Sequence, residues 1–138
     1  MRIIDADGLV LGRMSSVIAK SLLNGEEITI VNCEKALISG NRVNIIEEYE
    51  RSRAMGKGKR KGPYFPKMPD RIMRRTISRM MHHRMPKGKN AMARLTIHIG
   101  IPFSLNGAKF ESLEAAKKTG LKKYLTLGDI ARELGAQF

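Results

Sequence analysis

The sequence predicts an α/β domain built around a small, largely parallel β-sheet. The pattern of the sequence supports the fold class, and its length and composition support a single domain. Short apolar runs rich in β-branched residues alternate along the chain with longer segments whose apolar residues recur at helical spacing. The chain has 138 residues, of which 42% are hydrophobic, and this is enough for one domain with its own core. We therefore treat residues 1–138 as a single domain, which includes a basic segment at 51–89.

The first part of the chain contains two predicted strands and two predicted helices. The strands are "RII" at Arg2–Ile4 and "ITIVN" at Ile28–Asn32. Between them, "LGRMSSVIAKSLLNG" has helical periodicity, and Gly25 stands where a helix C-cap is expected. After a turn at Ser39–Asn41, "RVNIIEEYERSR" predicts a second helix. The predicted apolar faces of the two helices consist of Leu11, Met14, Val17, Ile18 and Leu22, and of Val43, Ile45, Ile46 and Tyr49.

The middle of the chain combines a loop with a helix. Gly56–Lys67 holds five basic residues, three Gly and two Pro, which predicts an irregular loop. "MPDRIMRRTISRMMHH" then predicts a helix, because Pro69 suits its first turn and Asp70 suits its positive end. The predicted apolar face contains Ile72, Met73, Ile77, Met80 and Met81 with Thr76 among them, and the opposite face contains Arg71, Arg74, Arg75, Arg79 and His82.

The last part of the chain contains a strand and two short predicted helices. "RLTIHIG" at Arg94–Gly100 alternates apolar and polar residues, as a half-buried strand does. "SLEAAKKTG" predicts a helix with Ser112 as its N-cap. "TLGDIARELG" predicts another, because Thr126 at the N-cap and Asp129 three residues later form a variant of the capping box.

The positive charge is concentrated in the middle of the chain. The net charge is +13, and residues 51–89 hold 14 basic residues and a single acidic one. Residues 1–50 carry −3 and residues 90–138 carry +3, so the flanks cancel. A soluble surface normally mixes the two signs. The segregation indicates a polyanionic partner, either a nucleic acid or an anionic membrane surface.

The composition of the basic segment favours RNA over a membrane. Lys and Arg neutralise phosphates, and arginines on one helix face can fork onto them. Tyr64 and Phe65 either stack on unpaired bases or sugars or anchor the loop to the core, and the sequence leaves both options open. The predicted apolar helix face contains no Trp or Phe to insert into lipid. No apolar run approaches the roughly 20 residues of a membrane span.

Enzymatic and metal sites find little support in the sequence. The turn at Gly8–Arg13 could present backbone amides to a phosphate, but it matches neither of the two common nucleotide-binding glycine patterns. His82 and His83 are adjacent and point about 100° apart on a helix, so they cannot easily share a metal ion. Cys33 is the only cysteine, which excludes an internal disulfide. The first residues include acidic side chains, whereas a secretory signal begins with basic ones, so we predict a cytoplasmic protein.

Four segments, in order, resemble the L-thirteen family of large-subunit ribosomal proteins in its archaeal and eukaryotic version. They are "DADGLVLGRMSSVIAKSLLNGE", "ITIVNCEKALISGNR", "GPYFPKMPDRIMRRTISRMMHHRMPKGKNAMARLTIHIGIP" and "KYLTLGDIARELG". Arg79 and His82 depart from the family pattern, because they stand where the family has the Gly and the Pro of Gly-Met-Leu-Pro. Without these two helix breakers, the helix is expected to continue past Met81. Lys87 replaces an Arg, which keeps the charge but loses bidentate geometry.

The resemblance implies a fold and a function. The implied fold is a three-layer α/β/α core with a small, mostly parallel four-stranded sheet, plus a basic loop–helix extension. The implied function is that of a structural constituent of the large ribosomal subunit, which binds large-subunit rRNA, supports early subunit assembly and so serves translation in the cytoplasm. Neighbouring large-subunit proteins are the other expected partners. The resemblance implies no catalytic activity, cofactor, metal or small-molecule substrate.

The predicted RNA-binding residues are the cations of the basic segment and two that support them. The same cations would also serve a free regulator that binds messenger RNA outside the ribosome, and the sequence leaves this alternative open. The residues predicted to bind rRNA are Arg13, Lys57, Lys59, Arg60, Lys61, Lys67, Arg71, Arg74, Arg75, Arg79, Arg84, Lys87, Lys89 and Arg94.

Overall fold

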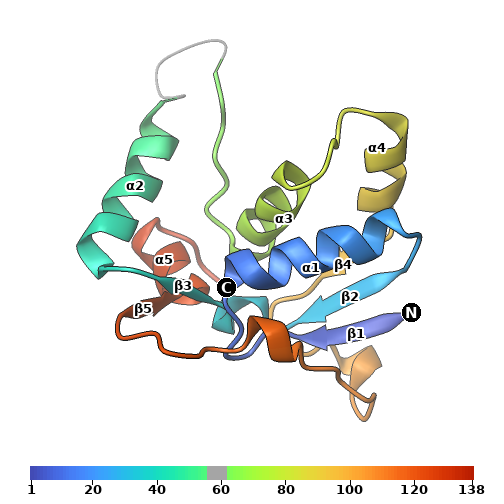
Figure 1. Ribbon diagram of the computed structural model, residues 1–138. Helices are drawn as coiled ribbons and strands as arrows, with labels where there is room; N and C mark the ends of the chain where they lie inside the picture. The colour runs from blue at the N-terminus through green and yellow to red at the C-terminus, as the bar shows by residue number, and fades with distance from the viewer. Residues whose placement is uncertain (56–61) are drawn as a thin grey trace.

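Three parallel strands form the centre of the fold (Figure 1). The computed structural model describes residues 1–55 and 62–138. β1 (Arg2–Asp5) pairs with β2 (Ile28–Val31), and β2 pairs with β4 (Leu95–Ile97), both in parallel. All four residues of β2 are buried, as expected for the central strand of a covered parallel sheet. The prediction of an α/β fold with a mostly parallel sheet is therefore confirmed.

The strand count differs from the expected one. Within residues 1–55 and 62–138, the parallel sheet has three strands, not four, and a separate antiparallel pair consists of β3 (Leu37–Ser39) and β5 (Tyr124–Thr126). Neither β3 nor β5 was predicted, because three residues are too few for an alternating pattern to stand out. The three-layer arrangement remains a prediction.

Five α-helices are present in the described part of the chain. In Figure 1, α1, α3 and α4 gather beside the parallel sheet, whereas α2 and α5 lie toward the β3–β5 pair. None of the helices in residues 1–55 and 62–138 combines the length and the apolar character needed to cross a bilayer. The helices are α1 (Leu11–Leu23), α2 (Arg42–Ala54), α3 (Pro69–Arg79), α4 (Pro86–Ala93) and α5 (Leu127–Glu133).

Helices α1 and α3 supply much of the main core. Both helices were predicted, and their buried residues are largely the predicted apolar faces, although Val17 is only partly buried and Met80 is 44% exposed. Gly25 follows α1 with a φ of +101°, which confirms the predicted C-cap region. The residues that these two helices bury in the core include Leu11, Met14, Ile18 and Leu22 from α1, and Ile72, Met73 and Ile77 from α3.

The end of α3 contradicts one prediction. The helix ends at Arg79 instead of continuing past Met81, and a turn leads into α4, which the sequence did not predict. Pro86 explains the break, because it occupies the first turn of α4 and forces Met85 into an extended conformation, with ψ at 152°. Gly88 allows α4 to approach this turn closely, since a Cβ atom there would lie 2.1 Å from the carbonyl oxygen of His82.

The two predicted C-terminal helices have different outcomes. The one expected from Ser112 is only a 3-10 turn at Glu114–Ala116, with Leu113 at its N-cap, so that prediction was wrong. The other is confirmed as α5. The side-chain oxygen of Thr126 accepts a hydrogen bond from the backbone N–H of Asp129 at 3.2 Å, as the capping pattern predicts.

Candidate nucleic-acid interface

A groove runs between α3, α4 and the segment at residues 62–67. It has a volume of about 660 Å³, and no carboxylate is among the described residues that line it. Its cationic side chains come from both helices, and Tyr64, which is 68% exposed, stands on the facing segment. We call it the basic groove. The side chains that line it are Tyr64, Pro66, Arg71, Arg74, Arg75, Ser78, His83, Lys89, Met92 and Ala93.

The apolar face of α3 holds the cations of the groove in place. Ile72, Met73 and Ile77 are almost fully buried, so the rotation of the helix about its axis is fixed by the core. The hydrophobic and cationic residues of α3 alternate at helical spacing, so fixing one face sets the direction of the other. Arg71 is exposed on that second face. The core therefore holds these side chains ready for a ligand.

Two of the groove arginines are partly engaged with the protein itself. The guanidinium of Arg74 donates to the carbonyl oxygens of Met92 and Leu95, each at 2.9 Å. Arg75 is half-buried, and its guanidinium carbon lies 4.0 Å from the centroid of the Phe65 ring. The Nε atom of Arg75 is buried and finds no hydrogen-bond partner in the described part of the chain. These contacts tie α3 to α4 and to the loop, and they place Phe65 against the protein.

The other predicted cations fall into three groups. Arg79, Arg84 and Lys87 are exposed on α3, the following turn and α4, as is Arg13 on α1. Two others are tied to backbone carbonyls, since Lys67 donates to Gly135 at 3.2 Å and Arg94 donates to Leu22 at 2.8 Å. Arg94 thus bonds a carbonyl near the C-terminus of α1, a structural role that spacing alone did not show. Lys57, Lys59, Arg60 and Lys61 lie outside the described residues.

Sequence reasoning did not place His83 in the groove. Its ring Nδ1 lies 3.1 Å from the carbonyl oxygen of Ser78, one turn back along the chain. This contact depends on the turn after Arg79, which the sequence did not predict. The signal that could have revealed it is Pro86, because a proline in the first turn of a new helix requires α3 to end before it.

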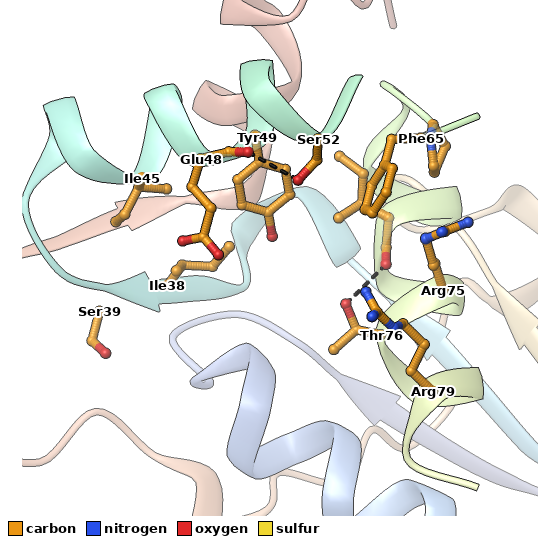
Figure 2. A pocket seen from close by; sticks show the side chains of 12 residues that line it. Ile38, Ser39, Ile45, Glu48, Tyr49, Ser52, Phe65, Arg75, Thr76 and Arg79 are labelled. Carbon is orange, nitrogen blue, oxygen red and sulfur yellow. Dashed lines mark hydrogen bonds between the residues drawn. The ribbon is translucent and has the colours of Figure 1, made fainter. Parts of the chain in front are cut away.

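A second opening lies between α2 and α3 (Figure 2). It has a volume of about 290 Å³, and its walls include Ile45 and Tyr49 from α2 and Phe65 and Ile72 on the other side. Burial, with a smaller contribution from the Glu48 carboxylate, raises the pKa of the Tyr49 hydroxyl above its ordinary value. The carboxylate of Glu48 also makes this opening less suited to a phosphate than the basic groove is.

In the turn before α1, two of the backbone amides are already bonded within the protein. The N–H of Leu9 donates to the carbonyl oxygen of Ala6 at 3.2 Å, and that of Val10 donates to the carbonyl oxygen of Ala116 at 2.8 Å. Cys33 is buried, and burial raises the pKa of its thiol to about 12, so it is a poor nucleophile. Within the described ranges, no three His, Cys, Asp or Glu side chains gather as metal ligands would.

Comparison with known proteins relates the chain to one family. The family model described as "Ribosomal protein L13" matches residues 1–104. A "Large ribosomal subunit protein uL13" of Methanococcoides burtonii is 49% identical over 140 residues, covering 100% of both chains. The protein of the same name in Methanosarcina barkeri is 44% identical over 141 residues, again covering 100% of both. That of Archaeoglobus fulgidus is 45% identical over 136 residues, covering 96% of this chain and 86% of the relative.

Proposed function

The chain belongs to the ribosomal protein L13 family, and we propose that it binds large-subunit rRNA through the basic groove. It is a structural protein of the large ribosomal subunit, of the archaeal type, and it takes part in translation. The family is not one of enzymes. The proposal specifies how this protein contacts its RNA, and it includes the support of early subunit assembly in the cytoplasm.

The single observation that carries the proposal is the charge of the basic groove. Arginine and lysine side chains converge on it from α3 and α4, His83 joins them from the turn between the two helices, and none of the described residues that line it is a carboxylate. Elsewhere the described ion pairs join Arg2, Arg42, Lys117 and Arg132 to acidic neighbours. Cations held together without nearby acids repel one another, and a phosphate backbone relieves that repulsion.

The groove offers an RNA strand two kinds of contact. Exposed cations such as Arg71 and Lys89 neutralise phosphates on its rim. The guanidinium of Arg74 already donates hydrogen bonds to two backbone carbonyls, so its remaining N–H donors are held in a fixed direction. Tyr64 stands at the same groove and can stack on an unpaired base or a ribose. Bound in this way, the protein would hold this RNA strand in place during assembly.

The salt dependence of binding to purified large-subunit rRNA tests this proposal. For the wild-type protein, log affinity should fall steeply with log salt, by roughly 0.7 to 0.9 for each neutralised phosphate. The variant R71Q/K89Q should give a slope shallower by about 1 to 2, because it removes two exposed cations that line the basic groove. A wild-type slope near zero would rule out binding through phosphates. Cosedimentation with large subunits separates this function from that of a free regulator of messenger RNA.

A further inference from the structure

A second group of cations lies far from the basic groove. Lys117, Lys118, Lys122 and Lys123 fall within residues 117–123, and no acidic residue occurs between Glu114 and Asp129. All four lysines are exposed. They lie on the connection that leads into β5, along the lower edge of Figure 1, whereas α3 and α4 lie in its upper half. We call residues 117–124 the lysine loop.

The lysine loop is fixed at both ends. Before it, Ala116 is fully buried, and its carbonyl oxygen accepts a hydrogen bond from the N–H of Val10 at 2.8 Å. At its other end, the carbonyl oxygen of Lys123 accepts from the N–H of Gly40 at 3.0 Å, and Leu125, the central residue of β5, is buried. Because the backbone is already held, less conformational entropy is lost when the lysines meet a ligand.

Most of the charge in the lysine loop is not neutralised by the protein. Lys117 pairs with Glu114, whereas Lys118, Lys122 and Lys123 form no ion pair in residues 1–55 and 62–138. The Nζ atom of Lys118 lies 3.5 Å from the centroid of the Tyr124 ring, which is 43% exposed. A cation beside an exposed aromatic ring is suited to a phosphate and its adjoining sugar or base.

We propose that the lysine loop binds a second stretch of rRNA backbone, so that the protein bridges two RNA segments. The proposal rests on the proposed function for the identity of the polyanion. Lysines act as point charges and contact phosphates without selecting a sequence. A membrane is a poorer fit, because Tyr124 is the only large apolar side chain that the loop exposes. The loop also lies outside residues 1–104, which the family model matches.

The first test compares salt slopes for rRNA binding between two triple variants of equal charge. The loop variant K118Q/K122Q/K123Q should have a slope shallower by about 2 to 3, and at about 0.1 M salt it should bind on the order of a hundredfold more weakly. The control K20Q/K35Q/K109Q removes three exposed lysines from other parts of the molecule. It should leave the slope close to that of the wild type. Equal effects of the two variants would mean general electrostatic attraction and would overturn the proposal.

The second test measures the acetylation of individual lysines by an amine-reactive reagent, with mass spectrometry as the readout. Purified rRNA should protect Lys118, Lys122 and Lys123, while Lys20 stays reactive. If rRNA leaves the loop reactive but the assembled subunit protects it, an acidic protein covers the loop and the proposal is wrong. A steep wild-type slope with an unprotected loop would refute only this inference. A wild-type slope near zero would refute both the inference and the proposed function.

Discussion

Helices α2 and α3 have similar lengths, but they relate to the core in opposite ways. α3 buries Ile72, Met73 and Ile77 in the main core. α2 buries only Ile45, in a small separate cluster, and Val43 on its predicted apolar side is 57% exposed. Figure 2 shows the two helices on opposite sides of an opening.

The two helices also differ in the balance of their charges. α2 contains both acidic and basic side chains, and Arg42 forms an ion pair with Glu133 of α5. α3 contains four arginines and a single carboxylate, Asp70, in its first turn. The helix with unbalanced charge is the one that is held firmly. A helix that must present like charges in fixed positions needs tertiary packing to hold it, because repulsion opposes it.

The largest expected effect tests whether α3 is packed more firmly against the core than α2. Ile77→Ala in α3 should lower the free energy of unfolding by about 2 to 5 kcal/mol, because the fully buried side chain would leave a cavity in the main core. Ile45→Ala in α2 makes the same chemical change beside an existing opening, so it should cost about 2 kcal/mol or less. Urea denaturation measures both losses. Equal losses would show that α2 is packed as firmly as α3.

The next effect concerns the junction between α4 and the turn that precedes it. Gly88→Ala would place a Cβ atom 2.1 Å from the carbonyl oxygen of His82, so the backbone would have to move. We expect a loss of roughly 1 to 3 kcal/mol, measured by urea denaturation, together with weaker rRNA binding. Gly12→Ala in α1 is the matched control, since among the described residues no atom beyond the adjoining backbone of α1 lies within 4 Å of its added Cβ. It should stabilise the protein by about 0.5 to 1 kcal/mol. A neutral Gly88→Ala would mean that the junction is loose.

The third prediction separates two arginines of α3 that the sequence treats alike. Arg74→Ala should cost about 1 to 3 kcal/mol of stability, because the carbonyl oxygens of Met92 and Leu95 lose a charged donor. Arg71→Ala should change stability by less than about 0.5 kcal/mol, since Arg71 is exposed, and yet it should weaken rRNA binding. Thermal melts and filter binding measure the two effects. If both variants melt alike, Arg74 does not tie α3 to α4.

The sequence predicted the long elements of this fold because their patterns repeat often enough to be recognised. The faces of α1 and α3 and the Thr126 cap of α5 depend on neighbours in sequence, and all three were found. The turn before α4 had a local signal in Pro86. In contrast, β3 and β5 depend on partners far along the chain, such as the Leu37–Thr126 pairing, so local patterns could not reveal them. The same limit applies to the site, because helical spacing places Arg71 and Arg74 on one face but cannot show that Arg74 meets two carbonyls.

The smallest expected effect concerns the ion pairs that lie outside α3. The Arg2 guanidinium donates to the Glu111 carboxylate, with one contact at 2.5 Å, and this bond holds the pKa of Glu111 below its ordinary value. Since the pKa is lowered in the folded state, the stabilisation is complete above the unfolded pKa. It is lost as the pH falls through the folded pKa. Both side chains are partly exposed, at 35% and 47%, so solvent limits the gain to below about 1 kcal/mol.

Urea titrations at neutral and acidic pH, on the wild type and on Glu111→Gln, test that last effect. Between neutral and acidic pH, the free energy of unfolding should fall less for the variant than for the wild type, because the amide of the variant cannot be protonated in that range. Arg71→Gln is the matched control on α3. It should leave the pH dependence unchanged, since in the described part of the chain Arg71 has no carboxylate partner whose titration could affect folding. If instead Arg71→Gln altered the decline, the cations of α3 would be coupled to acidic groups within the protein. Their charge would then be partly balanced before any RNA arrives.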